Sequence, residues 1–107
     1  MVSDEALEKA LDYLRDTADQ SAQRRAERLY LEDFSRVLRA EIMSGHLAEP
    51  VNAQERYAFS DVRYKNHLEA LKIAIFEDEK ARYLREAAAV KIEVYRTEQA
   101  TLRSLKI

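Results

Sequence analysis

The sequence predicts an all-α protein built as a long antiparallel helical hairpin, and three observations carry this prediction. The only glycine and the only proline, Gly45 and Pro50, lie close together near the middle of the 107-residue chain. Residues that favour helices, chiefly Ala, Leu, Glu, Arg and Lys, fill both flanks. No other glycine or proline is present to build the tight turns of a sheet. One turn between two helical arms is therefore the simplest fold.

The first arm is expected to span residues 4–43. Ser3 has the side chain of a helix N-cap, and acidic residues in the first turn suit the positive end of the helix dipole. An early seam of coiled-coil type follows a 4-3-4 spacing: Leu7, Leu11, Leu14 and Ala18. Apolar residues then thin out over residues 19–28 and return over residues 29–42. Gly45 lies where a glycine C-cap would end this arm.

The connection is expected to occupy residues 44–52 and to lead into a short helix over residues 53–59. Asn52 stands three residues before a glutamate, which is the spacing of an N-cap with its reciprocal partner. Either Ser60 or Asp61 can cap the helix that follows, so we expect a break between the short helix and the second arm.

The second arm is expected to span residues 62–105 and to carry two apolar seams. One seam keeps heptad-like steps: Phe76, Tyr83, Ala87, Val90 and Val94. The adjacent seam contains Ala88, Ile92, Tyr95 and Leu102. Because a partner helix normally covers a single seam, the second one predicts a homo-oligomer held by coiled-coil-like packing. The expected oligomer interface comprises Val90, Ile92, Val94, Tyr95 and Leu102.

Composition narrows the classes of function. The length predicts one helical domain over residues 1–107. The absence of cysteine excludes disulfides, thiolate catalysis and sulfur-ligated metals. With no basic leader and no apolar run of membrane length, we expect a cytoplasmic protein without a membrane partner. His46 and His67 are too far apart for a metal motif and are expected to be solvated or to cap helices. No catalytic constellation is recognisable, so neither an enzyme nor a cofactor is expected.

The charges are segregated along the chain, although the net charge is only −2. A chain with this net charge is not expected to coat nucleic acid through bulk charge alone. Residues 1–20 are strongly acidic and residues 80–107 strongly basic, and a hairpin would lay them side by side. Where the seams are interrupted, three arginines face three carboxylates across the hairpin, which favours a polar layer that fixes the register over a ligand site: Arg24, Arg25 and Arg28 opposite Glu77, Asp78 and Glu79.

Cations and aromatic residues are interleaved over residues 56–67, beside two arginines of the first arm. Single-stranded nucleic acid binds such surfaces because cations follow the phosphates and aromatic faces accept stacked bases. The candidate nucleic-acid-binding residues are Arg36, Arg39, Arg56, Arg63 and Lys65, with Tyr57, Phe59 and Tyr64 as stacking surfaces. The alternative is that these aromatic rings pack the tip of the hairpin while the cations stay solvated.

The end of the first arm, residues 37–45, resembles the K-A-R-L-D-Y-Y-S-G segment of the UvsY family of phage recombination mediators. Arg39, Ser44 and Gly45 match this segment, and Glu41 is a conservative match. In that family a basic pair before the turn contributes to single-strand binding. Here Arg39 takes one of the two positions, whereas Val37 replaces the lysine and Arg36 lies one residue earlier. The resemblance implies an oligomer that binds single-stranded DNA and helps a recombinase to displace single-strand-binding protein.

Two hypotheses of function follow. The first is an accessory recombination protein of a phage or prophage, which binds single-stranded DNA as an oligomer and helps to load a recombinase in the host cytoplasm. The second is a helical adaptor or structural assembly protein, whose apolar seams bind a protein partner and which has no direct contact with nucleic acid.

Overall fold

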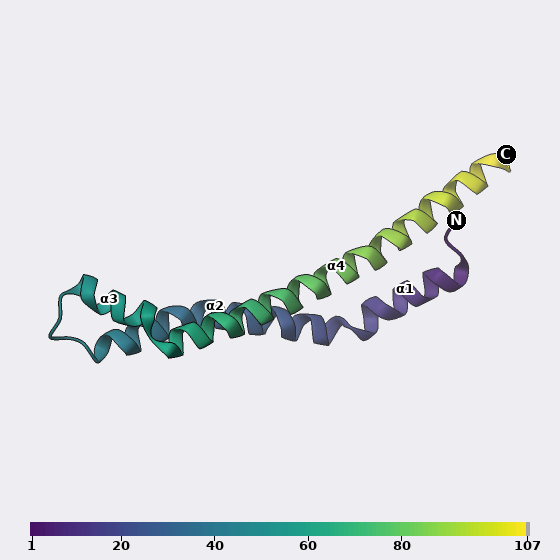
Figure 1. The fold of residues 1–107 in the computed structure, drawn as a ribbon. Helices are drawn as coiled ribbons and strands as arrows, with labels where there is room; N and C mark the ends of the chain where they lie inside the picture. Colours follow the sequence, from purple (N-terminus) through teal and green to yellow (C-terminus); the bar gives the residue numbers. More distant parts are fainter. Residues whose placement is uncertain (107) are drawn as a thin grey trace. The chain divides into compact units, whose positions relative to one another are not determined.

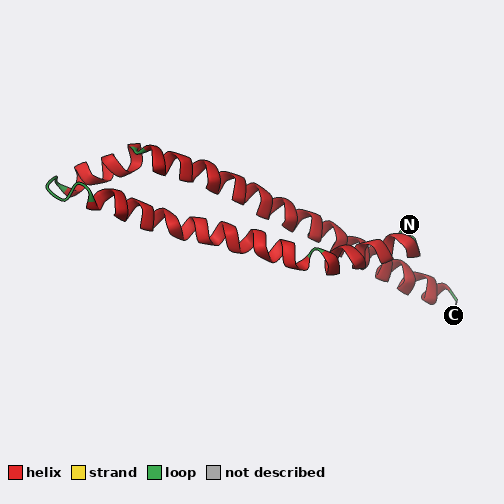
Figure 2. Cartoon of the chain, turned by 90° about the horizontal axis from the view of Figure 1, so that it is seen from below, coloured by secondary structure: helices red, strands yellow, loops and turns green. Residues whose placement is uncertain are grey.

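The structure, a computed structural model, describes residues 1–106. Within this range the chain forms four helices and no strand: α1 (Asp4–Asp16), α2 (Ala18–Ser44), α3 (Val51–Ser60) and α4 (Val62–Leu105) (Figure 1, Figure 2). The predicted all-α class is therefore confirmed. None of the described helices combines the length and the apolar character needed to cross a membrane.

Two compact units divide the chain. Unit 1 combines Met1–Ala22 with the chain from Glu79 onwards, and unit 2 comprises Gln23–Asp78. In unit 2, the C-terminal part of α2 lies beside the N-terminal part of α4, and the turn and α3 connect them at one end (Figure 1). Unit 2 is thus a helical hairpin with a short extra helix near its turn, as predicted. In unit 1, α1 packs against the C-terminal part of α4.

A small apolar core packs α3 against α2 in unit 2. Leu38, Ile42 and Ala58 form this core, and Ile42 and Ala58 are 2% and 0% exposed. Three partly buried side chains pack against it: Phe34, Met43 and Tyr64. The full burial of a methyl group at residue 58 means that α3 approaches α2 closely and that no larger side chain fits there.

The break between α3 and α4 occurs at the predicted place. Asp61 is the single non-helical residue between them, and its Oδ1 accepts a hydrogen bond of 2.8 Å from the backbone N–H of Arg63. This bond satisfies a backbone donor in the first turn of α4, which is the function of an N-cap.

The turn before α3 differs from the prediction. Asn52 is not the N-cap, because α3 already begins at Val51 and the side chain of Asn52 accepts only from the N–H of Ala53. The Pro50 carbonyl accepts from the N–H groups of Ala53 and Gln54, both at 3.0 Å, so the proline itself starts the helix. Gly45 follows the end of α2 but has no positive φ, so it is not a left-handed C-cap.

The inward faces of unit 2 keep a regular alternation of three- and four-residue steps that includes polar residues. On α2 this series of steps comprises Arg24, Arg28, Leu31, Ser35, Leu38 and Ile42, each of them buried or half-buried. On α4 the corresponding series comprises Tyr64, His67, Leu71, Ala74 and Asp78, again buried or half-buried throughout. The seam of the first arm therefore does not fade where apolar residues thin out. Polar side chains occupy it instead.

The predicted polar layer is present in unit 2. Arg28 Nη1 lies 3.1 Å from Asp78 Oδ2, and Arg24 pairs with Glu77. Asp78 is only 8% exposed, so its partner must offset the cost of removing a carboxylate from water. Arg25 is exposed, and Glu79 pairs with Arg82 along α4. Two of the predicted arginines thus align the arms.

Unit 1 begins with the predicted cap, since Ser3 Oγ accepts a hydrogen bond of 3.0 Å from the N–H of Ala6. The predicted seam of the first arm is correct at Leu7 and Leu14, which are half-buried, and wrong at Leu11 and Ala18. Ala10 is the buried residue, whereas Leu11 is 49% exposed and Ala18 is also exposed. On α4, most of the second predicted seam faces inward, as Ala88 is buried and Ile92 and Tyr95 are half-buried, whereas Leu102 is exposed.

The first arm is interrupted at Thr17, which separates α1 from α2 (Figure 2). The Thr17 hydroxyl donates to the carbonyl of Tyr13 at 2.6 Å. From α4, Arg85 Nη1 donates to both the Leu14 carbonyl and the Thr17 hydroxyl, each at 3.0 Å. A cation that satisfies carbonyls at the end of α1 stabilises the break, because these acceptors have no partner within the helix.

Candidate nucleic-acid interface

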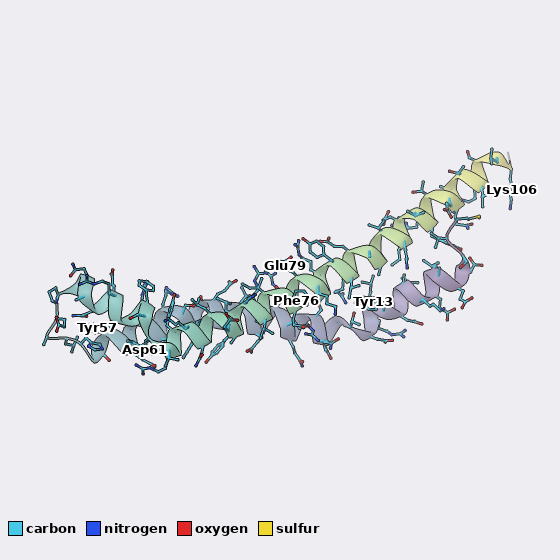
Figure 3. The ribbon with its side chains drawn as sticks, in the orientation of Figure 1. Tyr13, Tyr57, Asp61, Phe76, Glu79 and Lys106 are labelled. Atoms are coloured by element: carbon cyan, nitrogen blue, oxygen red, sulfur yellow. The ribbon has the colours of Figure 1, made fainter. Side chains whose placement is uncertain are left out.

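The candidate residues meet at the turn end of unit 2, where α2 ends, α3 lies and α4 begins. Figure 3 labels Tyr57 and Asp61 in this region. We call this region the tip and define it as residues 36–67. It carries five arginine or lysine side chains and four carboxylates, so any attraction for phosphate depends on how these groups are arranged and not on net charge.

One cluster in the tip joins a cation to two aromatic rings. The Cζ atom of Arg39 lies 5.7 Å from the centroid of the Phe59 ring. Phe59 meets Tyr64 edge to face, with centroids 5.4 Å apart and an interplanar angle of 84°. Tyr64 packs on the core, which fixes the cluster to the hairpin, yet Phe59 remains 47% exposed. The arrangement places a guanidinium group over an aromatic ring that remains partly exposed.

Tyr57 belongs to a second aromatic pair. Its ring stacks on His46 with centroids 4.0 Å apart and an interplanar angle of 3°. His46 is half-buried in this stack, so it is neither fully solvated nor a helix cap as predicted. Tyr57 is 45% exposed. A ring held in a fixed orientation and partly open to solvent is suited to stacking with a further planar group.

The cations of the tip differ in how strongly carboxylates neutralise them. Arg56 and Lys65 are exposed and form no ion pair with the residues that the structure describes. Arg36 lies 3.7 Å from Asp33, and both side chains are largely exposed. Arg63 makes a two-pronged contact with Asp61, with Nε and Nη2 at 3.1 and 3.0 Å from the carboxylate oxygens. Arg63 is therefore the candidate cation that an anionic ligand would recruit least easily.

His67 is a core residue that the sequence analysis placed wrongly in solvent or at a helix end. It is 7% exposed, and its Nε2 lies 2.7 Å from Ser35 Oγ. The rings of Phe34 and Tyr64 flank it, with centroids at 5.6 and 6.3 Å. The available signal was its spacing, because His67 falls between Tyr64 and Leu71 on the inward face of α4.

The hydrogen bonds between Arg63 and Asp61 predict that the free energy of unfolding depends on pH. Hydrogen bonds from the side chain and backbone of Arg63 hold the pKa of Asp61 below its ordinary value of 3.8. A lowered pKa in the folded state contributes stability above the unfolded pKa and loses it as the pH falls through the folded pKa. Below about pH 4, therefore, the wild type should lose more stability than Asp61→Asn, measured by urea unfolding at stepped pH. Parallel losses in the two proteins would contradict this assignment.

The structure divides the predicted oligomer interface, all of which lies in unit 1. Val90 and Val94 are 60% and 41% exposed, and Leu102 is 38% exposed. Ile92 and Tyr95 are half-buried, and the Tyr95 hydroxyl donates a hydrogen bond of 2.7 Å to Asp4 Oδ1 in α1. This bond raises the pKa of Tyr95. The seam of Val90 and Val94 is thus open to a further chain, whereas Ile92 and Tyr95 already face α1.

Comparisons of the chain with protein-family models, with curated proteins and with solved structures find no match. A proposal of function for this chain therefore rests on the geometry of the tip and of the exposed seam of Val90 and Val94.

Proposed function

We propose that this chain is an accessory recombination protein of a phage or prophage, which binds single-stranded DNA through the tip as a homo-oligomer. The observation that carries the proposal is the cluster of Arg39, Phe59 and Tyr64, with exposed Arg56 and Lys65 nearby in the sequence of the tip. A surface that combines aromatic rings with cations can bind a single strand, because the rings stack on its bases and the cations contact its phosphates. Phe59 supplies a partly exposed ring, and Arg39 supplies the guanidinium group that lies over this ring.

Self-association would make this surface effective. One tip offers few contacts and near-neutral charge, so a single copy should bind weakly. Several copies in one oligomer raise the effective concentration of every further tip once the first is bound. We propose that the exposed seam of Val90 and Val94 supplies the contact between copies, since it is apolar and uncovered within the chain.

The partners proposed from the resemblance to the UvsY family are a recombinase and a single-strand-binding protein. In this role the oligomer holds the strand in the cytoplasm of the host cell while the recombinase replaces the single-strand-binding protein. The tip fits such a role because stacking and phosphate contacts do not require a particular base sequence.

The experiment that tests DNA binding is fluorescence anisotropy of a labelled oligo-dT with the purified protein at low and physiological salt. We expect salt-sensitive binding, because phosphate contacts release counterions from the strand. Absence of binding even at low salt would refute the proposal.

Replacing Asp61 by asparagine should strengthen DNA binding. The change removes a carboxylate from the tip and releases Arg63 from its two-pronged contact, while asparagine keeps the ability to cap α4. One additional phosphate contact should steepen the log-log salt dependence by about 0.7. The matched control is Glu69→Gln, which removes an exposed carboxylate from α4 outside the tip. Equal effects of the two changes would argue against a role for Arg63.

Replacing Val90 by aspartate should dissociate the oligomer. A charge in the middle of an apolar contact loses its hydration without gaining a partner. Light scattering should show a fall in mass to that of a single chain, with the helical circular dichroism retained. Ala89→Asp is the control, because residue 89 is also exposed on α4 but lies outside the seam. A wild-type protein that is already monomeric would exclude this interface.

A helical adaptor is the second candidate function, and one observation favours it. Tyr83 and Val90 are each 60% exposed on α4 in unit 1, and an apolar stripe of this kind fits a helix of another protein as well as a second copy. In that case the oligo-dT experiment gives no binding, and Val90→Asp abolishes capture of the partner while leaving the mass of the isolated protein unchanged.

A further inference from the structure

A hollow of about 310 Å³ lies along α3 in the tip, and the nucleic-acid proposal does not account for all of its lining. The residues around it are Glu49, Ala53, Arg56, Tyr57 and Ser60. Tyr57 therefore belongs both to this hollow and to the stacked pair, whereas His46 itself does not line the hollow. Glu49 is the unexpected member, because a carboxylate beside a strand of phosphates repels it.

Contacts within the tip fix two parts of the lining before any ligand is bound: the backbone at residue 49 and the ring of Tyr57. The N–H of Glu49 donates to the His46 carbonyl at 3.0 Å, and the Glu49 carbonyl accepts 2.8 Å from Gln54 Nε2. Gln54 is only 9% exposed, so a buried side chain anchors the backbone at residue 49. On α3, stacking on His46 orients Tyr57. A site built in advance loses less entropy when it binds.

The three chemical groups around the hollow match guanine better than the other bases. The Tyr57 ring can stack on any base, and a guanidinium such as that of Arg56 pairs with the guanine O6 and N7 acceptors. Guanine alone also offers two adjacent N–H groups, N1–H and the 2-amino group, to a single carboxylate. Thymine has one N–H, and adenine and cytosine have only an amino group. A guanine would therefore give Glu49 an attractive role.

We propose that this hollow is a guanine subsite, so that the protein binds single-stranded DNA with a preference for strands that contain guanine. The inference rests on the proposed DNA-binding function and adds a base preference to it. Glu49 accepts from the two N–H groups of the base, Arg56 donates to its acceptor edge and Tyr57 stacks on its face.

The test compares labelled oligonucleotides of equal length made of TG, TA or TC repeats, with binding measured by anisotropy at fixed salt. The TG strand should bind about tenfold more tightly than the other two, which corresponds to one two-pronged base contact. Glu49→Gln should abolish this tenfold ratio of affinities, because an amide cannot accept from both N–H groups of the guanine. Glu55→Gln removes the same charge from an exposed residue of α3 outside the hollow and should keep the ratio.

Equal affinities for the three strands in the wild type would overturn the guanine subsite and leave the DNA-binding proposal standing. Loss of the preference for the TG strand in both Glu49→Gln and Glu55→Gln would also overturn the guanine subsite, because the preference would then depend on the overall charge of the tip. Failure to bind any of the strands would refute DNA binding itself and the subsite with it. Circular dichroism of each variant verifies that the helices remain folded.

Discussion

Replacing Ile42 by alanine should lower the free energy of unfolding by about 2–4 kcal/mol, the largest effect that we expect from one side chain. Ile42 is 2% exposed and touches the small core that seats α3 on α2. The change removes buried methyl groups and leaves a cavity that the neighbouring helices cannot fill completely. Urea unfolding followed by far-UV circular dichroism, at one fixed protein concentration, measures the difference.

Val37→Ala is the matched control for this change. Val37 is a branched apolar residue of the same helix but is 49% exposed, so its truncation should alter stability by less than about 0.5 kcal/mol. Similar losses in the two variants would show that the core around Ile42 does not hold unit 2 together. Ile42→Ala should also weaken DNA binding, because the position of Phe59 depends on the packing of α3 against α2.

The double change Arg36→Ala and Arg39→Ala should reduce the affinity for oligo-dT about tenfold or more. The slope of log affinity against log salt concentration should become less steep by about 1.4, or about 0.7 for each lost phosphate contact. Arg39 lies over Phe59, and Arg36 is one helical turn earlier with a largely exposed side chain. Anisotropy titrations at several salt concentrations give both quantities.

The control for the double change removes two cations from unit 1. Lys9 and Arg96 each pair with a carboxylate of their own helix, as Arg36 does with Asp33. Lys9→Ala with Arg96→Ala changes the net charge by the same amount and should leave the salt slope close to that of the wild type. An equal loss in both double variants would mean that the whole protein attracts DNA without a site at the tip.

The N-terminal ends of α1 and α4 could be predicted from the sequence, because a capping side chain close to each end determines where the helix begins. Ser3 caps α1 and Asp61 caps α4 because a single side chain bonds to a backbone N–H two or three residues away. The turn was harder to predict. The carbonyl of Pro50 starts α3, and this depends on the path of the chain through residues 45–50 and not on a side-chain motif.

The inward faces could not be predicted from apolar residues alone. His67, Asp78 and Arg85 occupy inward positions on α4, each with a polar partner on the opposite arm of its unit. A pattern based on hydrophobicity skips such residues, and it therefore selected Leu11 for the seam of α1 although this residue is exposed. The polar partners are far away in the sequence, so only the folded structure identifies them.

The candidate site was predictable as a set of residues but not as a geometry. Interleaved cations and aromatic residues pointed to the tip, and the structure brings Arg39, Phe59 and Tyr64 together. The stacking of Tyr57 on His46 and the pairing of Arg63 with Asp61 had no signal in the spacing. The first contact depends on the path of the turn between α2 and α3, and the second lies where α4 begins.

The most direct test of the central claim is photo-crosslinking of the wild-type protein to a single strand that carries 5-iodouracil, followed by mass spectrometry of the linked peptides. Halogenated uracil couples mainly to aromatic rings that stack on it. We expect cross-links at Tyr57, Phe59 or Tyr64, and the cross-link at Phe59 should disappear in the Phe59→Leu variant. Cross-links confined to the aromatic residues of unit 1, such as Tyr83 and Tyr95, would contradict binding at the tip.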